Sequence, residues 1–181
     1  MKISVKTRTG FYSHDEFDEI LKVYNKYPIT ELIIHPRIRE DYYKNTPNMR
    51  AFGDAYNNSP LKICYNGDIY NRGAYERIVT EYPKLHSVML GRGAVKNPAL
   101  FREIKGGEKL KTEELIKFSD VLEERYLALL QSERYTLNKL KEIWLHMMEN
   151  FPEEKKIFKA VKKSMTLSDL KSAVYSLPEK N

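Results

Sequence analysis

Apolar residues gather in four short runs along the first 90 positions, at 3–5, 31–35, 61–65 and 87–90. A polar or glycine-rich turn follows each run. Stretches with apolar residues three and four positions apart, typical of amphipathic helices, lie between the runs. This alternation predicts four βα units of a parallel sheet. Residues that follow the runs would then lie at the carboxyl ends of the strands, where α/β folds place their functional sites.

The predicted helices of these units span about 15–27, 72–82 and 98–104. The segment 36–60 contains three prolines and an Asn-Asn-Ser stretch, which interrupt any regular period. We therefore expect a partly helical, exposed connection between the second and third strands.

The pattern changes after residue 106, where no further strand is predicted. Four helical periods are predicted at about 112–131, at 137–150, after Pro152 and at about 168–177. Four such helices favour a small four-helix bundle. We thus predict an α/β domain over residues 1–106 and a helical domain over residues 107–181.

Composition narrows the class of protein. The net charge is +6 and the pI is about 9.2, which favours a polyanionic partner. The single cysteine, Cys64, excludes an internal disulfide and a cysteine-rich zinc site, and we expect it to be buried. No secretory signal and no apolar run of roughly 18 residues is present, so we expect a cytoplasmic protein without membrane contact.

Two residues at the ends of the first runs could contact a cofactor. Lys6 follows the first run and could donate to an anionic or polarised atom. His35 ends the second run, and a neutral imidazole there could donate to a phosphate. A solvated lysine and a histidine bonded to the backbone are the alternatives. The other histidines have no spacing that indicates a metal site.

Glycine-containing turns follow the third and fourth runs. Asn66-Gly67-Asp68 fits a type I′ hairpin, but it also fits a turn before a helix, because a helical pattern follows Tyr70. In the second interpretation the backbone amides form an anion site. In Gly91-Arg92-Gly93 the glycines would let a phosphate approach closely, and the arginine would neutralise it.

Several basic residues are candidates for contacts with phosphates. Arg37 and Arg39 carry forked donors suited to phosphate. In the helical part the candidates are Arg134, Lys139, Lys141, Lys155 and Lys159. Glutamates lie among these bases, so a solvated face of mixed charge is the alternative. Trp144, at helical spacing with apolar neighbours, is predicted to be core.

Four motifs occur in a fixed order over residues 4–101: V-K-T-R-x-G, I-I-H-P-R-x-R, N-G-D-I and M-L-G-R-G-A-x-x-N-P-x-L-F. In this order they resemble the second half of the tRNA-dihydrouridine synthases. The segment 137–144 also resembles the C-terminal domain of that family, although less sharply. One departure is Pro36, where the family commonly has glycine.

The resemblance implies half of a TIM-type (β/α)8 barrel that binds FMN at its carboxyl mouth and reduces uridine in tRNA with NADPH. Lys6 and His35 should then contact FMN, while Arg37 and Arg39 should lie near FMN and the bound RNA. The phosphate end of the FMN site should be formed by Asn66, Gly67, Asp68, Gly91 and Arg92.

The resemblance also implies missing parts. A full barrel takes roughly 250 residues and eight strands. The catalytic cysteine of the family has no match here, so we assign no catalytic residue and expect a fragment that is inactive alone. Open sheet edges predict self-association. The alternatives are half a barrel of another FMN- or phosphate-binding oxidoreductase, and an RNA-binding module without catalysis.

Overall fold

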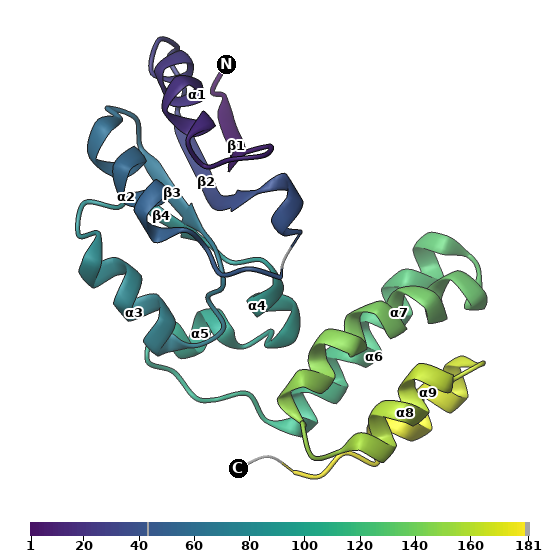
Figure 1. The fold of residues 1–181 in the computed structure, drawn as a ribbon. Coiled ribbons are helices and arrows are strands. Elements are labelled where there is room, and N and C mark those ends of the chain that lie inside the picture. The colour runs from purple at the N-terminus through teal and green to yellow at the C-terminus, as the bar shows by residue number, and fades with distance from the viewer. Residues whose placement is uncertain (43, 180–181) are drawn as a thin grey trace. The chain divides into compact units, whose positions relative to one another are not determined.

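The computed structural model describes residues 1–42 and 44–179, and it contains a four-stranded sheet (Figure 1). The strands are β1 (Ser4–Gly10), β2 (Glu31–Ile38), β3 (Ile63–Asn66) and β4 (Ser87–Met89). They lie in the order β1-β2-β3-β4, and every neighbouring pair is parallel. The four predicted parallel strands are thus confirmed. The hairpin alternative is wrong, because β3 and β4 run in the same direction.

The strands are connected by α1 (Glu16–Tyr24), η1 (Arg39–Asp41) with α2 (Met49–Asn58), and α3 (Arg72–Glu81). The connection before β3 is partly helical, as predicted, but it is not simply exposed, because α2 buries Phe52 completely. The side chain of Asn48 caps this helix by accepting a hydrogen bond of 3.0 Å from the Ala51 amide. The helix is only ten residues long and prolines flank it, so its apolar pattern could not be recognised in the sequence.

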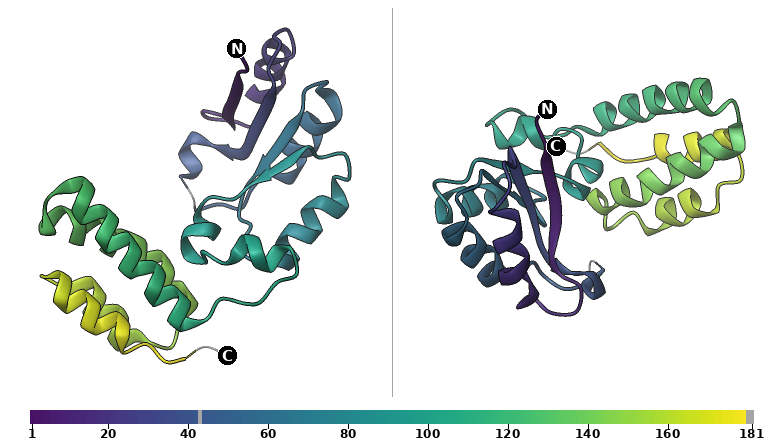
Figure 2. Two further views of the ribbon diagram at one scale, coloured as in Figure 1. Left: turned by 180° about the vertical axis from the view of Figure 1, so that it is seen from behind. Right: turned by 90° about the horizontal axis from the view of Figure 1, so that it is seen from above.

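The two faces of the sheet differ in character. On one face, Leu32 and Ile34 are fully buried beneath helices, and α1 and α2 lie side by side on this side (Figure 2). Phe52 packs edge-to-face against Tyr65 of β3, with ring centroids 4.8 Å apart. Side chains alternate between the faces of a strand, so the other face carries Lys6, Ile33, Cys64 and Ser87 in one row of the register.

The remaining helices are α4 (Arg92–Lys96), α5 (Leu100–Ile104), α6 (Thr112–Leu130), α7 (Glu133–Met147), η2 (Met148–Asn150), α8 (Lys155–Lys163) and α9 (Leu167–Tyr175). The helices α6 to α9 share one core, in which Leu115, Leu140 and Val161 are almost completely buried. Trp144 lies at its centre, which confirms its prediction as core. Within the described ranges, no helix is both long and apolar enough to cross a membrane.

The chain divides into two compact units: residues 1–69 with 73–91, and residues 70–72 with 92–181. We predicted a boundary at 106/107, but α4 packs against α7 in the second unit. The side-chain Nδ2 of Asn150 donates to the Lys96 carbonyl oxygen at 2.7 Å, and the Lys96 ammonium lies 3.3 Å from the Glu149 carboxylate. The helices that follow β4 are therefore held by the later helices.

Candidate site at the carboxyl ends of the strands

His35, Arg37 and Asp68 form a polar cluster at the carboxyl ends of β2 and β3. His35 and Arg37 are two residues apart in β2, so their side chains project from the same face of the sheet. Arg8 of β1 is in register with His35 and belongs to that face as well. Asp68 follows the last residue of β3 by two positions. The cluster thus joins two strands that are distant in sequence.

Arg37 holds the cluster together. It is only 1% exposed, and its Nη1 and Nη2 both donate to the carboxylate of Asp68. Nη1 also lies 3.0 Å from Nε2 of His35, and Nε donates to the carbonyl oxygen of Asn45 at 2.8 Å. This bidentate pairing is a strong form of ion pair. Arg37, which we predicted near RNA, is therefore buried and ties β2 to two loops.

His35 is buried, and its environment keeps it neutral. Burial is the largest cause, followed by the positive charges of Arg37, Lys6 and Arg8, and together they lower the pKa of His35 to about 4. The negative charge of Asp68 opposes this shift only partly. At neutral pH the ring is therefore an uncharged imidazole.

The turn after β3 is tightly packed. The side-chain amide of Asn66 donates from Nδ2 to the carbonyl oxygen of Met89 at 2.9 Å, which links β3 to β4. A Cβ atom at Gly67 would lie 2.7 Å from the Tyr65 hydroxyl oxygen, so only glycine fits without rearrangement. Asp68 has φ of 26°, a conformation that is uncommon for a residue other than glycine. In this conformation the carboxylate of Asp68 accepts from both terminal nitrogens of Arg37.

The other predicted cofactor residues occupy different positions. Lys6 is exposed and lies within β1, which continues to Gly10, so it is not at the strand end as we expected. Gly91 follows β4 by two residues, and no atom lies within 4 Å of the place a Cβ would take. Arg92 begins α4, where its guanidinium carbon lies 5.8 Å from the centre of the Tyr70 ring.

Sequence reasoning missed the role of Arg8. Its Nη1 donates to the carbonyl oxygen of Ile38 at 2.6 Å, and its Nη2 donates to that of Tyr42 at 3.2 Å. Arg8 thus holds the end of β2 against β1. The motif V-K-T-R-x-G contained this residue, but a side chain that binds distant backbone carbonyls leaves no local sequence signal. Arg39, by contrast, is exposed, with its guanidinium 4.5 Å from the centre of the Phe11 ring.

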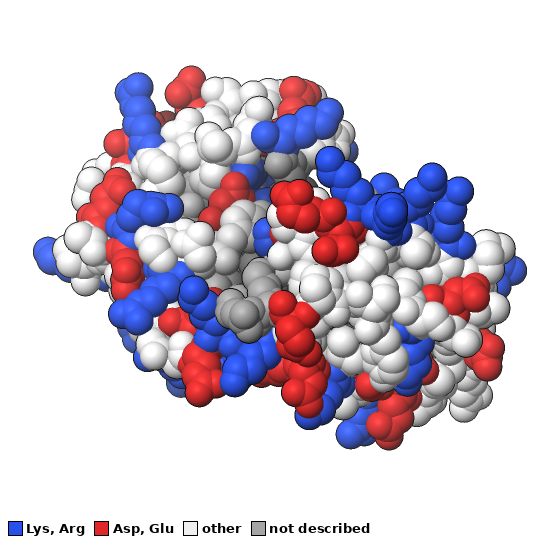
Figure 3. Space-filling view, turned by 90° about the horizontal axis from the view of Figure 1, so that it is seen from below, with Lys and Arg blue, Asp and Glu red and all other residues white. Residues whose placement is uncertain are grey.

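The predicted RNA-binding residues of the helical unit differ in availability. Lys141 donates to the carbonyl oxygen of Ser164 at 2.8 Å, which joins α7 to the end of α8. Lys139 lies 3.2 Å from the Glu142 carboxylate. The three remaining candidates, Arg134, Lys155 and Lys159, are exposed. On the face shown in Figure 3, basic and acidic side chains lie next to one another over much of the surface.

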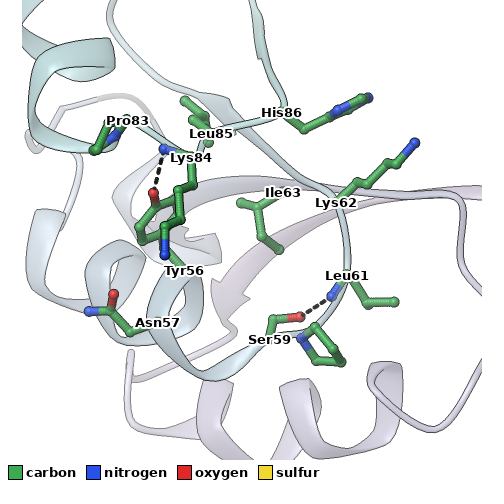
Figure 4. A pocket seen from close by; sticks show the side chains of 11 residues that line it. Tyr56, Asn57, Ser59, Leu61, Lys62, Ile63, Pro83, Lys84, Leu85 and His86 are labelled. Carbon is green, nitrogen blue, oxygen red and sulfur yellow. Dashed lines mark hydrogen bonds between the residues drawn. The ribbon is translucent and has the colours of Figure 1, made fainter.

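A hollow of about 810 Å³ lies at the other end of the sheet, where the loops enter β3 and β4 (Figure 4). Tyr56, Lys62, Lys84 and His86 are among its lining residues. Because it lies at the amino ends of the strands, it is separate from the cluster of His35. A smaller hollow of about 380 Å³ adjoins Gly67 and Asp68. Among the described residues, no group of three or more His, Cys, Asp and Glu side chains could hold a metal.

Parallel βα units with polar residues gathered at the carboxyl ends of the strands define an α/β protein of the type that binds ligands there. The model of one family, dihydrouridine synthase (Dus), matches residues 1–178 of the chain. The chain belongs to the dihydrouridine synthase family, a family of tRNA-modifying oxidoreductases, and the resemblance of the four motifs is thereby confirmed.

The curated relatives include tRNA-dihydrouridine(16) synthases of two bacteria. That of Escherichia coli O157:H7 is 25% identical over 182 residues, which cover 98% of this chain and 56% of the relative. That of Shewanella oneidensis is 24% identical over 169 residues, covering 93% of this chain and 53% of the relative. The tRNA-dihydrouridine synthase B of Proteus vulgaris is 34% identical over 105 residues, or 57% and 32% of the two chains. The chain thus spans about half the length of these relatives, or less.

Proposed function

We propose that the chain supplies part of an FMN-dependent tRNA-dihydrouridine synthase, with the strand ends holding FMN and the helical unit binding tRNA. The observation that carries the proposal is the family match over residues 1–178, together with the four motifs at successive strands of one parallel sheet. In this proposal, bound FMN would supply the redox chemistry that links the oxidation of NADPH to the reduction of the uracil ring. The protein is then a cytoplasmic enzyme of tRNA processing.

The residues at the strand ends suit FMN. The backbone at Gly91 has open space where a side chain would be, so an anionic group can approach it closely. Arg92, next along the chain, supplies a positive charge for a phosphate. In the proposal these two residues, with Asn66, Gly67 and Asp68, form the phosphate end. In the proposal, the neutral His35 of β2 would face the flavin ring, and so would Lys6, which is exposed and lies within β1 and not at its end.

The complete reaction needs more than the described residues supply. Cys64 is buried in β3 and burial raises the pKa of its thiol, so we assign it to packing and not to catalysis. Within the described part of the chain, β1 and β4 each pair with one neighbour only. In the proposal these edges accept further strands, either of the remaining barrel or of a second copy. The chain alone would then be inactive.

The lysines of α8 are the best candidates for contacts with tRNA. All five lysines of this helix, Lys155, Lys156, Lys159, Lys162 and Lys163, are exposed, and the helix contains no acidic residue. At 3.6 residues per turn they fall within an arc of about 120°. Ile157, Phe158 and Val161 occupy the opposite side and pack on the helical core. One face of α8 is therefore purely basic, unlike the mixed surface that the sequence allowed.

Replacing lysines on this face should weaken tRNA binding and reduce its salt dependence. The slope of log K against log salt is negative. We expect the variant Lys155→Gln/Lys159→Gln/Lys162→Gln to make it shallower by roughly 2–3, since each phosphate contact contributes about 0.7–0.9. Fluorescence anisotropy with labelled tRNA at several salt concentrations measures this slope.

A matched variant separates a specific face from general charge. Lys22→Gln/Lys111→Gln/Lys117→Gln removes three lysines that are each paired with a nearby glutamate. Both variants change the net charge from +6 to +3 (6 − 3 = 3). The slope should change much less in the matched variant. Equal losses in the two variants would contradict a binding face on α8.

A further inference from the structure

The contact between Arg37 and His35 determines which ring nitrogen of His35 carries the proton. A guanidinium has five N–H donors and no acceptor, so any atom that it bonds must accept. Nη1 of Arg37 lies 3.0 Å from Nε2 of His35. Nε2 must therefore carry a lone pair, and the proton of the neutral ring must lie on Nδ1. We infer that Arg37 is a positioning residue that holds His35 in the Nδ1–H form and fixes the direction of that N–H bond.

The surroundings of Arg37 restrict the orientation of its guanidinium. Its side chain is 1% exposed, and the carboxylate of Asp68 accepts from both terminal nitrogens. The carbonyl oxygen of Asn45 accepts from Nε at 2.8 Å. Three acceptors thus fix the plane of the guanidinium, and the position of Nη1 follows from that plane. The fork geometry cannot be reproduced by a lysine.

The same contact keeps the ring uncharged. A protonated His35 would carry a hydrogen on Nε2, which would point at the Nη1 hydrogens of Arg37. Burial and the charge of Arg37 both lower the pKa of His35, in agreement with this geometry. The imidazole therefore neither titrates nor changes its tautomer near neutral pH. The use of the Nδ1–H group by a flavin rests on the proposed function, whereas the tautomer does not.

Nitrogen-15 NMR of the imidazole tests the inference in the chain as it exists, without cofactor or tRNA. The His35 resonances are assigned by their loss in His35→Gln. In the wild type we expect the Nδ1–H pattern, unchanged between pH 6 and pH 8. An Nε2–H pattern in the wild type would overturn the inference.

The decisive variant is Arg37→Met/Asp68→Leu, which removes both charges and so leaves no buried charge without its partner. We expect the Nε2–H form to become populated, and the protonation midpoint of His35 to rise, because the charge of Arg37 lowers the pKa by more than the charge of Asp68 raises it. An unchanged tautomer and midpoint in the folded variant would contradict a positioning role. Arg39→Met, which removes an exposed arginine two residues away, should leave both quantities unchanged.

A second variant keeps the test valid if the double variant does not fold. Asp68→Asn retains Arg37 and its donor to Nε2, so the Nδ1–H form should persist. Its midpoint should fall, because the charge of Asp68 raises the pKa of His35. Conversion of Asp68→Asn to the Nε2–H form would assign the control of the tautomer to Asp68 and overturn the role of Arg37. Failure of FMN or tRNA binding affects none of these outcomes.

Discussion

Trp144→Ala should destabilise the helical unit by about 3–5 kcal/mol, the usual cost of emptying a buried aromatic site. Trp144 is 0% exposed and lies in the core that α6, α7, α8 and α9 share. Its Nε1–H also donates to Ser119 Oγ at 2.8 Å, so truncation leaves that buried hydroxyl without this partner. The measurement is urea unfolding followed by circular dichroism, because Trp144 is the single tryptophan and the variant has no tryptophan fluorescence.

Two further variants separate the causes. Trp144→Phe keeps most of the volume and loses the hydrogen bond, so it should cost less than the alanine variant. Leu129→Ala truncates a side chain of α6 that is 75% exposed, and it should change the stability by less than about 0.5 kcal/mol. If Trp144→Ala cost no more than Leu129→Ala, the packing of the four helices would be incorrect.

The unit that contains the sheet should lose about 2 kcal/mol of stability between pH 7 and pH 4.5 because of His35 alone. The pKa of His35 is about 4 in the folded chain, against 6.5 for an unperturbed histidine. Between these values the unfolded state binds the proton and the folded state does not. Stability therefore increases with pH in this window, is fully present above about pH 6.5, and is lost as the pH falls towards 4.

The control is His35→Gln, which cannot titrate. Its free energy of unfolding, measured in urea at half-unit steps from pH 7 to pH 4.5, should depend less on pH than that of the wild type. The pKa values of Asp41 and Glu16 are also lowered in the folded chain. Their protonation destabilises both proteins below this window, so the window is limited to pH 4.5 and above. Equal pH dependence in the two proteins would show that His35 is not buried as a neutral ring.

The strands and most helices followed from periodicity, because each element has one face that must be buried. The parallel arrangement also followed, since a helical pattern separated Asn66 from the fourth run. The burial of α2 was not predicted, because prolines flank this helix and it is only ten residues long. The division between the units could not be predicted from the turn at 106–107, because it depends on packing of α4 against α7.

The sequence predicted that the candidate site lies at the strand ends, but not which of its side chains are buried or which of them contact one another. Sequence reasoning grouped Arg37 with Arg39 as arginines near RNA, although one is buried and the other exposed. The difference follows from where β2 ends: Arg37 lies within the strand, on the face of His35, and meets Asp68 from the turn after β3, whereas Arg39 lies beyond the strand and begins η1. Such a contact joins residues 31 positions apart and has no local signature.

The central claim is that FMN binds at the carboxyl ends of the strands, with its phosphate near Gly91. Backbone NMR of the isotope-labelled chain during titration with FMN tests it most directly, because chemical shifts map even weak binding. Riboflavin, which lacks the phosphate, is the matched control ligand. We predict FMN-dependent shifts at residues 66–68 and 91–92, and markedly smaller shifts there with riboflavin. Shifts confined to residues 56–63 and 83–86, around the hollow at the opposite end of the sheet, would contradict the account.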